Sequence, residues 1–180
     1  AAETDTDLPN RRPKDAATLL VLEGRGPDAS VLMGRRRRDL AFMPGMFVFP
    51  GGRVDPADSR VPIAASYRPS VAHRLMTDMK GPRTTARARA FAVAAIRETY
   101  EEAGLLVGRP AEGGPPGRAW DAFRARSLLP DLSGIRFLAR AITPPRRTRR
   151  FDTRFLAVTA DAVADRLPEG IGPDDEFEEI

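Results

Sequence analysis

The alanine-rich segment at residues 86–103 predicts a long helix, because alanine has the highest helix propensity and no proline interrupts the run. Gly104 follows directly and is a typical helix C-terminus. Side chains three and four residues apart share a helix face, so Glu98, Glu101 and Glu102 point the same way, with Arg97 one turn before Glu101. We expect the opposite face to pack, through Val93, Ile96 and Tyr100.

Three carboxylates on one face repel one another, and a divalent cation would relieve that repulsion. Hard oxygen ligands suit magnesium or manganese. The alternative is a solvent-exposed acidic stripe that contains an Arg97–Glu101 pair. The upstream turn Gly51-Gly52, reached through Phe49-Pro50, favours the metal site, because backbone amides in such a turn can approach a phosphate closely.

The segment from Arg97 to Leu105, Arg-Glu-x-x-Glu-Glu-x-Gly-Leu, resembles the Nudix box of the Nudix hydrolases when it is read together with Pro50-Gly51-Gly52. That pattern is Gly, five residues, Glu, seven residues, then Arg-Glu-hydrophobic-x-Glu-Glu-x-Gly-hydrophobic. Gly52 matches its opening glycine, and Asp58 stands where the pattern has Glu. Residues 59–96 then occupy the place of seven residues, and Thr99 stands where an aliphatic residue is usual. The second half of the box is thus a close match, and the first half is stretched.

The resemblance implies an α/β fold, the Nudix α/β/α sandwich with a mixed β-sheet and a loop–helix–loop box. We expect a single Nudix hydrolase domain at 1–180, with a flexible lead-in at 1–15. Residues 59–83 form an insertion within the box, as in long-insert Nudix proteins related to coenzyme A diphosphatases, and we expect it to form a cap beside the site. Nudix chains usually continue into another strand and helix, so we expect either a C-terminally truncated chain or a sandwich that lacks that helix.

The resemblance also assigns roles in the site. Glu98, Glu101 and Glu102 would bind Mg²⁺ or Mn²⁺, with Glu176 as a further acidic ligand from a late loop and Glu169 as the second candidate. Glu101 or Glu102 would act as the catalytic base, and Arg97 would hold a glutamate in its ligating rotamer.

Substrate binding is expected at Gly51 and Gly52 and at arginines from two basic clusters, 35–38 and 146–150. Arg38 represents the first cluster. Arg150 and Arg154, four apart on a strand, would share one side and grip a diphosphate or the 3′-phosphate of coenzyme A. The alternative for the first cluster is a solvated strand edge that resists association with other strands.

Hydrophobic patterning predicts the remaining elements. Strands are expected at 15–22, 30–34, 46–49, 105–107, 135–142 and 151–158, with the second a hairpin partner of the first. Short helices are expected at 71–79, capped by Ser70, at 120–129 and at 159–166.

Composition excludes several kinds of chemistry. The chain has no cysteine, a single histidine and no apolar run near the ~20 residues of a membrane span. Its net charge of +4 rests on 29 basic residues, almost all arginine, but no aromatic-interleaved basic stretch or nucleic-acid module accompanies them. We therefore expect a cytoplasmic enzyme with a small nucleotide-type substrate, no membrane or nucleic-acid partner, and an oligomeric state left open between monomer and homodimer.

Three functions fit the sequence. The first is a metal-dependent pyrophosphatase of a nucleoside diphosphate linked to another moiety, with coenzyme A or acyl-coenzyme A favoured. The second is a housecleaning pyrophosphohydrolase of nucleoside triphosphates, and the third is a Nudix-fold binding or regulatory protein without turnover.

Overall fold

The computed structural model describes residues 10–77, 79–168 and 170–180. Most of the predicted lead-in at 1–15 lies outside the described residues, as do Asp78 and Glu169. The last two residues of the predicted lead-in, Lys14 and Asp15, belong to the first strand, because they pair with Phe151 and Asp152 of a distant strand. The lead-in prediction is therefore wrong at its C-terminal end.

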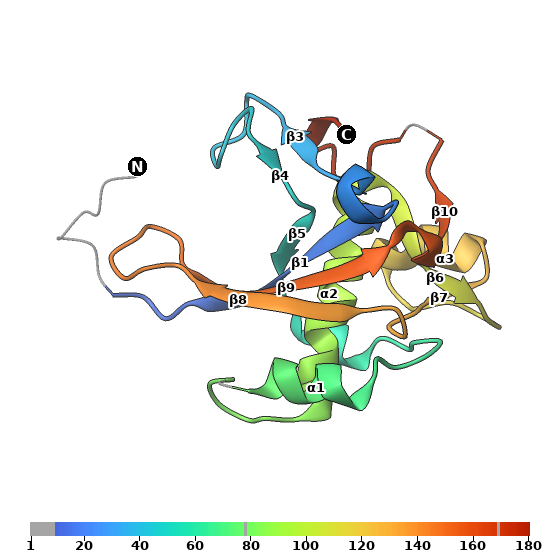
Figure 1. Ribbon diagram of the computed structural model, residues 1–180, viewed down its shortest axis with the longest axis horizontal. Coiled ribbons are helices and arrows are strands. Elements are labelled where there is room, and N and C mark those ends of the chain that lie inside the picture. The colour runs from blue at the N-terminus through green and yellow to red at the C-terminus, as the bar shows by residue number, and fades with distance from the viewer. Residues whose placement is uncertain (1–9, 78, 169) are drawn as a thin grey trace.

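A mixed five-stranded sheet forms the centre of the molecule (Figure 1). Its strand order is β2-β1-β9-β8, and β5 also pairs with β1. The strands are β1 (Lys14–Glu23), β2 (Ser30–Val31), β5 (Gly51–Arg53), β8 (Arg136–Ile142) and β9 (Phe151–Thr159). β1 runs parallel to β9, and the other pairs are antiparallel, which confirms the mixed α/β sheet.

The predicted long helix is α2 (Thr85–Ala103), which packs across this sheet. The Thr84 side chain accepts a hydrogen bond from the Arg87 N–H and begins the helix. Gly104 ends it with φ +66°, a left-handed conformation that glycine adopts without a Cβ penalty. Val93 and Ile96 are fully buried as expected, and the buried hydroxyl of Thr99 donates to the Ala95 carbonyl, which satisfies it without a distant partner.

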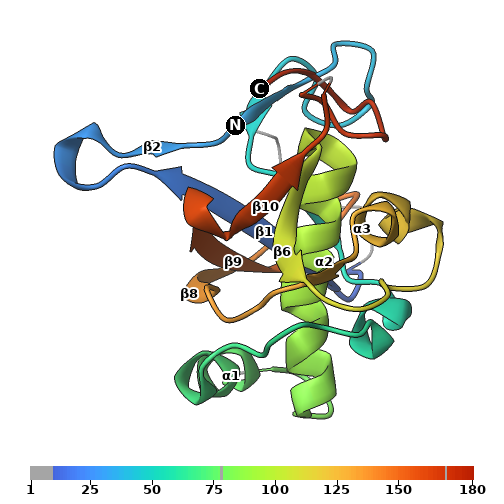
Figure 2. The ribbon, with the colours of Figure 1, turned by 90° about the vertical axis from the view of Figure 1, so that its right-hand side faces the viewer.

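The insertion at 59–83 contributes to the core and contains α1 (Pro69–Met76). α1 packs against α2 and β8, with Val71 and Leu75 buried. It lies at the opposite end of the molecule from β3 and the C-terminus (Figures 1 and 2). Ser70 does not cap it, because the helix begins at Pro69, two residues earlier than expected, after Arg68, whose side chain makes no capping hydrogen bond.

Two smaller three-stranded sheets flank the central one. The first has the order β10-β6-β7, and the second β11-β3-β4. Their strands are β3 (Gly34–Arg36), β4 (Phe47–Val48), β6 (Leu105–Pro110), β7 (Leu128–Pro130), β10 (Val163–Arg166) and β11 (Phe177–Glu179). Short helices complete the fold: α3 (Asp121–Ala125) and the 3₁₀ turns Gly26–Asp28, Pro56–Arg60, Arg118–Trp120 and Ala160–Ala162.

Two predicted helices are wrong in part. The helix at 120–129 ends at Ala125, because Leu128–Pro130 pairs with β6. The helix at 159–166 is one 3₁₀ turn followed by β10, which also pairs with β6. Helix propensity yields here to strand pairing between distant segments.

The two faces of the central sheet differ in burial. Ala17, Leu19 and Leu156, on the face covered by α2, are fully buried. Thr18 and Thr153, on the other face, are only half-buried.

The described part of the chain contains no helix long and apolar enough to cross a bilayer.

Candidate functional site

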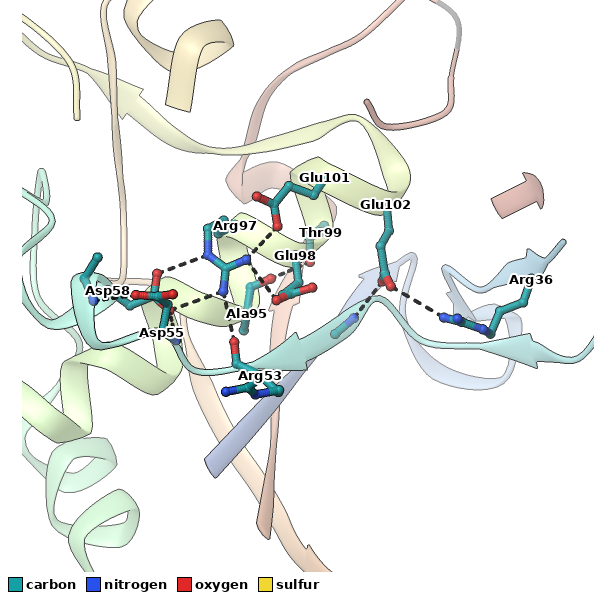
Figure 3. A network of polar contacts seen from close by, with 12 residues as sticks. Arg36, Arg53, Asp55, Asp58, Ala95, Arg97, Glu98, Thr99, Glu101 and Glu102 are labelled. Atoms are coloured by element: carbon teal, nitrogen blue, oxygen red, sulfur yellow. Dashed lines mark hydrogen bonds and ion pairs between the residues drawn. The ribbon is translucent and has the colours of Figure 1, made fainter. Parts of the chain in front are cut away.

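Arg97 is the centre of a polar network on α2 (Figure 3). Its Nη1 atom donates to Glu98 Oε1 at 2.9 Å and to Glu101 Oε2 at 2.6 Å. Its Nε and Nη2 atoms donate to the two carboxylate oxygens of Asp58, at 3.1 and 3.3 Å, and Nη2 also donates to the Arg53 carbonyl. One guanidinium therefore holds two carboxylates of the helix and ties them to the loop that follows β5.

Asp58 is the buried anchor of that loop, with 2% of its surface exposed. It accepts a hydrogen bond from the Asp55 N–H, while Asp55 accepts one from the Ala57 N–H, so the pair caps the 3₁₀ turn Pro56–Arg60 reciprocally. Despite the intervening residues 59–96, Asp58 faces Arg97 directly. The long insertion leaves the two halves of the box in contact.

Glu102 lies on the other side of the same helix end, against β5. Its Oε2 atom accepts the Gly51 N–H at 2.9 Å, and its Oε1 atom lies 3.8 Å from Arg36 Nη1. At Gly52 the strand passes so close to the helix that an added Cβ atom would lie 2.5 Å from Glu98 Cδ. The glycine pair thus allows the strand to approach the two carboxylates.

A cavity of about 280 Å³ opens where β1, β5 and β9 meet the end of α2, and we name it the carboxylate cavity. Its lining combines three carboxylates, three guanidinium groups and two phenylalanines. Its residues are Ala16, Thr18, Arg36, Phe42, Gly51, Gly52, Arg53, Glu98, Glu102, Arg149, Phe151, Thr153 and Glu176.

Burial sets the electrostatics of this cavity. Loss of hydration raises the pKa of Glu102 to about 8, opposed by the Gly51 N–H and reinforced by the nearby charges of Glu98 and Glu176. Loss of hydration likewise raises the pKa of Glu98 to about 7, although Arg97 acts in the opposite direction. The carboxylates therefore occupy a setting in which negative charge is unfavourable, and a cation among them would offset that cost.

The donor chemistry fits Mg²⁺ or Mn²⁺, because every acidic group of the cavity offers hard oxygen atoms. Within the described residues, no three acidic or histidine side chains are gathered as a ready-made ligand set. Arg97 separates Glu98 from Glu101, and Glu102 faces Gly51. Binding of an ion therefore requires these side chains to change rotamer.

Glu176 and Arg36 come to the cavity from opposite ends of the chain. Arg36 Nη1 donates to Glu176 Oε2 at 2.7 Å, and Arg36 Nε donates to the Phe42 carbonyl. Arg38, predicted to bind substrate, is not among the residues that line the cavity. β3 ends at Arg36, and Arg36 is the residue of the cluster 35–38 that lines the cavity.

Arg154 contradicts its predicted role. Only 1% of its surface is exposed, its guanidinium pairs with Asp152, and it stacks 4.9 Å from the centre of the Phe91 ring of α2. This side of β9 faces the helix, so Arg154 cannot grip a substrate, and it does not share a cavity with Arg150. Arg150, by contrast, lines a separate cavity at the start of β9.

Glu101 points away from the carboxylate cavity. It lines a neighbouring hollow with Tyr100 and Asp174, and the Asp174 N–H donates to the Glu101 carbonyl. Of the three helix glutamates, Glu98 and Glu102 share the carboxylate cavity, together with Gly51 and Gly52. The insertion contributes no residue to its lining, but Arg60 and Val61 of the insertion line a neighbouring cavity together with Asp58 and Arg97, so a cap beside the site stays a prediction.

Sequence reasoning missed several residues of the cavity, among them Arg53, Phe42 and Arg149. Arg149 belongs to the basic cluster 146–150 and lies 5.8 Å from the centre of the Phe42 ring, a contact that neither residue signals alone. Arg53 directly follows Gly52, and this adjacency was the one feature of the sequence that could have placed Arg53 at the site.

Two curated proteins are similar to this chain in sequence. No family model matches the chain. The acyl-coenzyme A diphosphatase NUDT19 of Gallus gallus is 30% identical over 158 residues, covering 65% of this chain and 38% of that protein. The protein of the same name from Xenopus laevis is 32% identical over 97 residues, covering 44% of this chain and 26% of that protein. The chain thus spans well under half the length of these two relatives.

A solved structure gives the more complete match. The crystal structure of a NUDIX hydrolase from Alicyclobacillus acidocaldarius is 32% identical to this chain, with a TM-score of 0.63. The match covers 89% of this chain and 76% of that one. Likeness of both sequence and fold over this length, together with the Arg97-centred box, shows that the chain belongs to the Nudix hydrolase family.

Proposed function

We propose that this chain hydrolyses a phosphoanhydride bond in a nucleoside diphosphate linked to another moiety, with coenzyme A or acyl-coenzyme A as the favoured substrate. The carboxylate cavity carries this proposal, because Glu98, Glu102 and Glu176 line it together with Arg36, Arg53 and Arg149. Carboxylates suit a divalent cation, and guanidinium groups suit the oxygens of a diphosphate. The two relatives named acyl-coenzyme A diphosphatases support the choice of substrate.

The residues of the site divide between holding a cation and restraining the carboxylates in this proposal. Glu98, Glu102 and Glu176 would hold Mg²⁺ or Mn²⁺, which when bound supplies positive charge against the phosphoryl oxygens. Arg97 restrains Glu98 and Glu101, and the Gly51 N–H restrains Glu102. Arg36 keeps Glu176 beside Glu102.

The reaction itself is attack of water on phosphorus. One phosphoanhydride bond breaks, the oxygen of water ends on one of two phosphorylated products, and a carboxylate accepts the proton of the attacking water. Glu101 or Glu102 is the base in this proposal. Glu102 is favoured as the base because it lies in the carboxylate cavity, whereas Glu101 points away from it.

A substrate panel tests the proposal. Coenzyme A, an acyl-coenzyme A, ADP-ribose and the nucleoside triphosphates are each incubated with the purified chain and Mg²⁺ or Mn²⁺, and products are identified by mass spectrometry. Adenosine 3′,5′-bisphosphate with a phosphopantetheine is the expected pair from coenzyme A. Release of diphosphate from triphosphates would favour the housecleaning function, and binding without turnover would favour the regulatory one.

Replacement of Glu102 by Gln tests the role of its charge. We expect Glu102→Gln to reduce kcat/KM by about 10² or more, because a neutral amide neither attracts a cation nor accepts the proton. Glu112→Gln is the matched control, since Glu112 lies on an exposed loop away from the cavity. Equal rates for Glu102→Gln and the control would refute the assignment.

A further inference from the structure

A second cavity, of about 460 Å³, lies beside the carboxylate cavity, and we name it the basic cavity. It forms where the start of β1 meets the loop that joins β8 to β9, which lie together at one end of the central sheet (Figure 1). Its cationic lining consists of Arg11, Arg12, Lys14, Arg53, Arg149 and Arg150. No carboxylate lines it within the described ranges of the chain.

The basic cavity and the carboxylate cavity share lining residues, and both are lined by the same face of β1. Arg53, Arg149 and Phe151 line both. Lys14 of the basic cavity and Ala16 and Thr18 of the carboxylate cavity lie at alternate positions of β1, so they share one face of the sheet. At the rise of a β-strand, Lys14 and Thr18 are about 13 Å apart. A single extended ligand can therefore occupy both cavities.

The charge of the basic cavity is poorly neutralised. Several arginines elsewhere pair with a carboxylate, as Arg87 does with Asp15 and Arg109 with Asp131. Among residues 10–77, 79–168 and 170–180, the side chains of Arg11, Arg12 and Lys14 form no ion pair. A concave site with this excess of positive charge attracts a multivalent anion.

Arg150 has a structural task in the cavity. Its Nε atom donates to the Thr143 carbonyl, and its Nη1 atom donates to Asn10 Oδ1 at 2.7 Å and to the Arg11 carbonyl. These hydrogen bonds fix the segment at residues 10–11 against the β8–β9 loop. Arg150 thus shapes the wall that presents Arg11 and Arg12, and its side chain also lines the cavity.

We propose that the basic cavity binds a phosphate monoester of the substrate, remote from the diphosphate that is cleaved. The inference rests on the proposed function, and it adds a determinant of specificity to it. A phosphate monoester carries close to two negative charges and several acceptor oxygens, which match clustered guanidinium groups. Because Arg53 and Arg149 belong to both cavities, the monoester belongs to the same molecule as the diphosphate.

Coenzyme A and dephospho-coenzyme A test the proposal directly, because they differ only in the 3′-phosphate monoester. We expect the wild-type chain to have a higher kcat/KM for coenzyme A, by tenfold or more. Arg12→Gln and Lys14→Gln should each reduce this ratio severalfold, and together abolish it, while kcat/KM for dephospho-coenzyme A stays unchanged. Arg25→Gln, on the exposed β1–β2 turn, is the matched control and should leave the ratio intact.

A binding measurement separates this inference from the proposed function. Adenosine 3′,5′-bisphosphate and AMP are titrated into the chain by calorimetry in a chelating buffer, where no hydrolysis occurs. Tighter binding of the bisphosphate that is lost in Arg12→Gln/Lys14→Gln supports the subsite, even if coenzyme A is not cleaved. Equal affinity for the two nucleotides would overturn it, even if coenzyme A is cleaved.

Inorganic phosphate is the third ligand, and it distinguishes the monoester of a substrate from a free anion. If the cavity serves the substrate, phosphate should compete with coenzyme A and leave the KM for dephospho-coenzyme A unchanged or lower. Phosphate binding in the basic cavity that does not affect coenzyme A kinetics would overturn the proposal.

Discussion

Replacement of Gly52 by Ala should separate catalysis from stability. A Cβ atom at Gly52 would lie 2.5 Å from Glu98 Cδ and 2.6 Å from Glu98 Oε1, whereas ordinary van der Waals contact begins near 3.4 Å. The Glu98 carboxylate must therefore move by about 1 Å or leave its rotamer. The backbone of Gly52 does not have a positive φ, so β5 itself accepts alanine.

The expected magnitudes differ for the two properties. Displacement of a reacting or ligating group by about 1 Å typically costs about 10² in rate, equivalent to about 2.7 kcal/mol of transition-state stabilisation. The free energy of unfolding should change by less than about 1 kcal/mol. The moving group is the end of a flexible side chain, and alanine reduces the conformational entropy of the unfolded chain.

Steady-state kinetics with Mg²⁺ and coenzyme A, alongside urea denaturation of the metal-free chain, measure both quantities. Gly134→Ala is the matched control, because its added Cβ would meet only Ala162 Cβ, at 3.8 Å. Wild-type kcat/KM in Gly52→Ala would refute the reasoning. So would a loss of activity accompanied by an equal loss of stability, because strand disruption would then explain both.

Two further predictions concern buried carboxylates. Asp58→Asn should destabilise the chain by about 2 kcal/mol and lower kcat, because an amide nitrogen must face either the Arg97 guanidinium or the Asp55 N–H. Urea denaturation and steady-state kinetics measure the two effects, with exposed Asp28→Asn as the control. Wild-type stability together with wild-type kcat in Asp58→Asn would contradict this prediction. Burial opposes the charge of Asp152, but Arg140 and Arg154 lower its pKa below the ordinary value, so wild type should exceed Asp152→Asn in stability by about 3 kcal/mol at neutral pH. This advantage is complete above the unfolded pKa of about 3.9 and is lost as pH falls through the lowered folded pKa, so equal stability of wild type and Asp152→Asn in urea titrations at neutral pH would contradict the pairing.

Local patterning predicted the principal elements well. The helix expected at 86–103 is Thr85–Ala103, and the strands expected at 15–22 and 135–142 are Lys14–Glu23 and Arg136–Ile142. These elements are long, and their side chains repeat with a clear period, so the local signal is strong. The segment at 159–166 failed for the opposite reason, because its fate depended on pairing of Val163–Arg166 with β6.

The residues of the site were likewise predicted in part. Glu98, Glu102, Gly51 and Gly52 were predicted from their spacing and from the resemblance to the Nudix box, and they line one cavity. Spacing also placed Arg154 on a definite side of β9, but it could not tell which side faced α2. Only packing of Phe91 against that side made Arg154 a buried residue.

The amino-acid sequence by itself singled out the groups that we propose carry the chemistry: a helix with three glutamates and an arginine, preceded by a glycine pair. The tertiary structure decided which charges meet. Arg36 and Glu176 are 140 residues apart and form an ion pair beside Glu102, while Arg38, two residues from Arg36, lines no part of the cavity. The physical reason is that a local pattern fixes the direction of a side chain relative to its own helix or strand. The partner of that side chain is fixed only when distant strands align and bury their shared face.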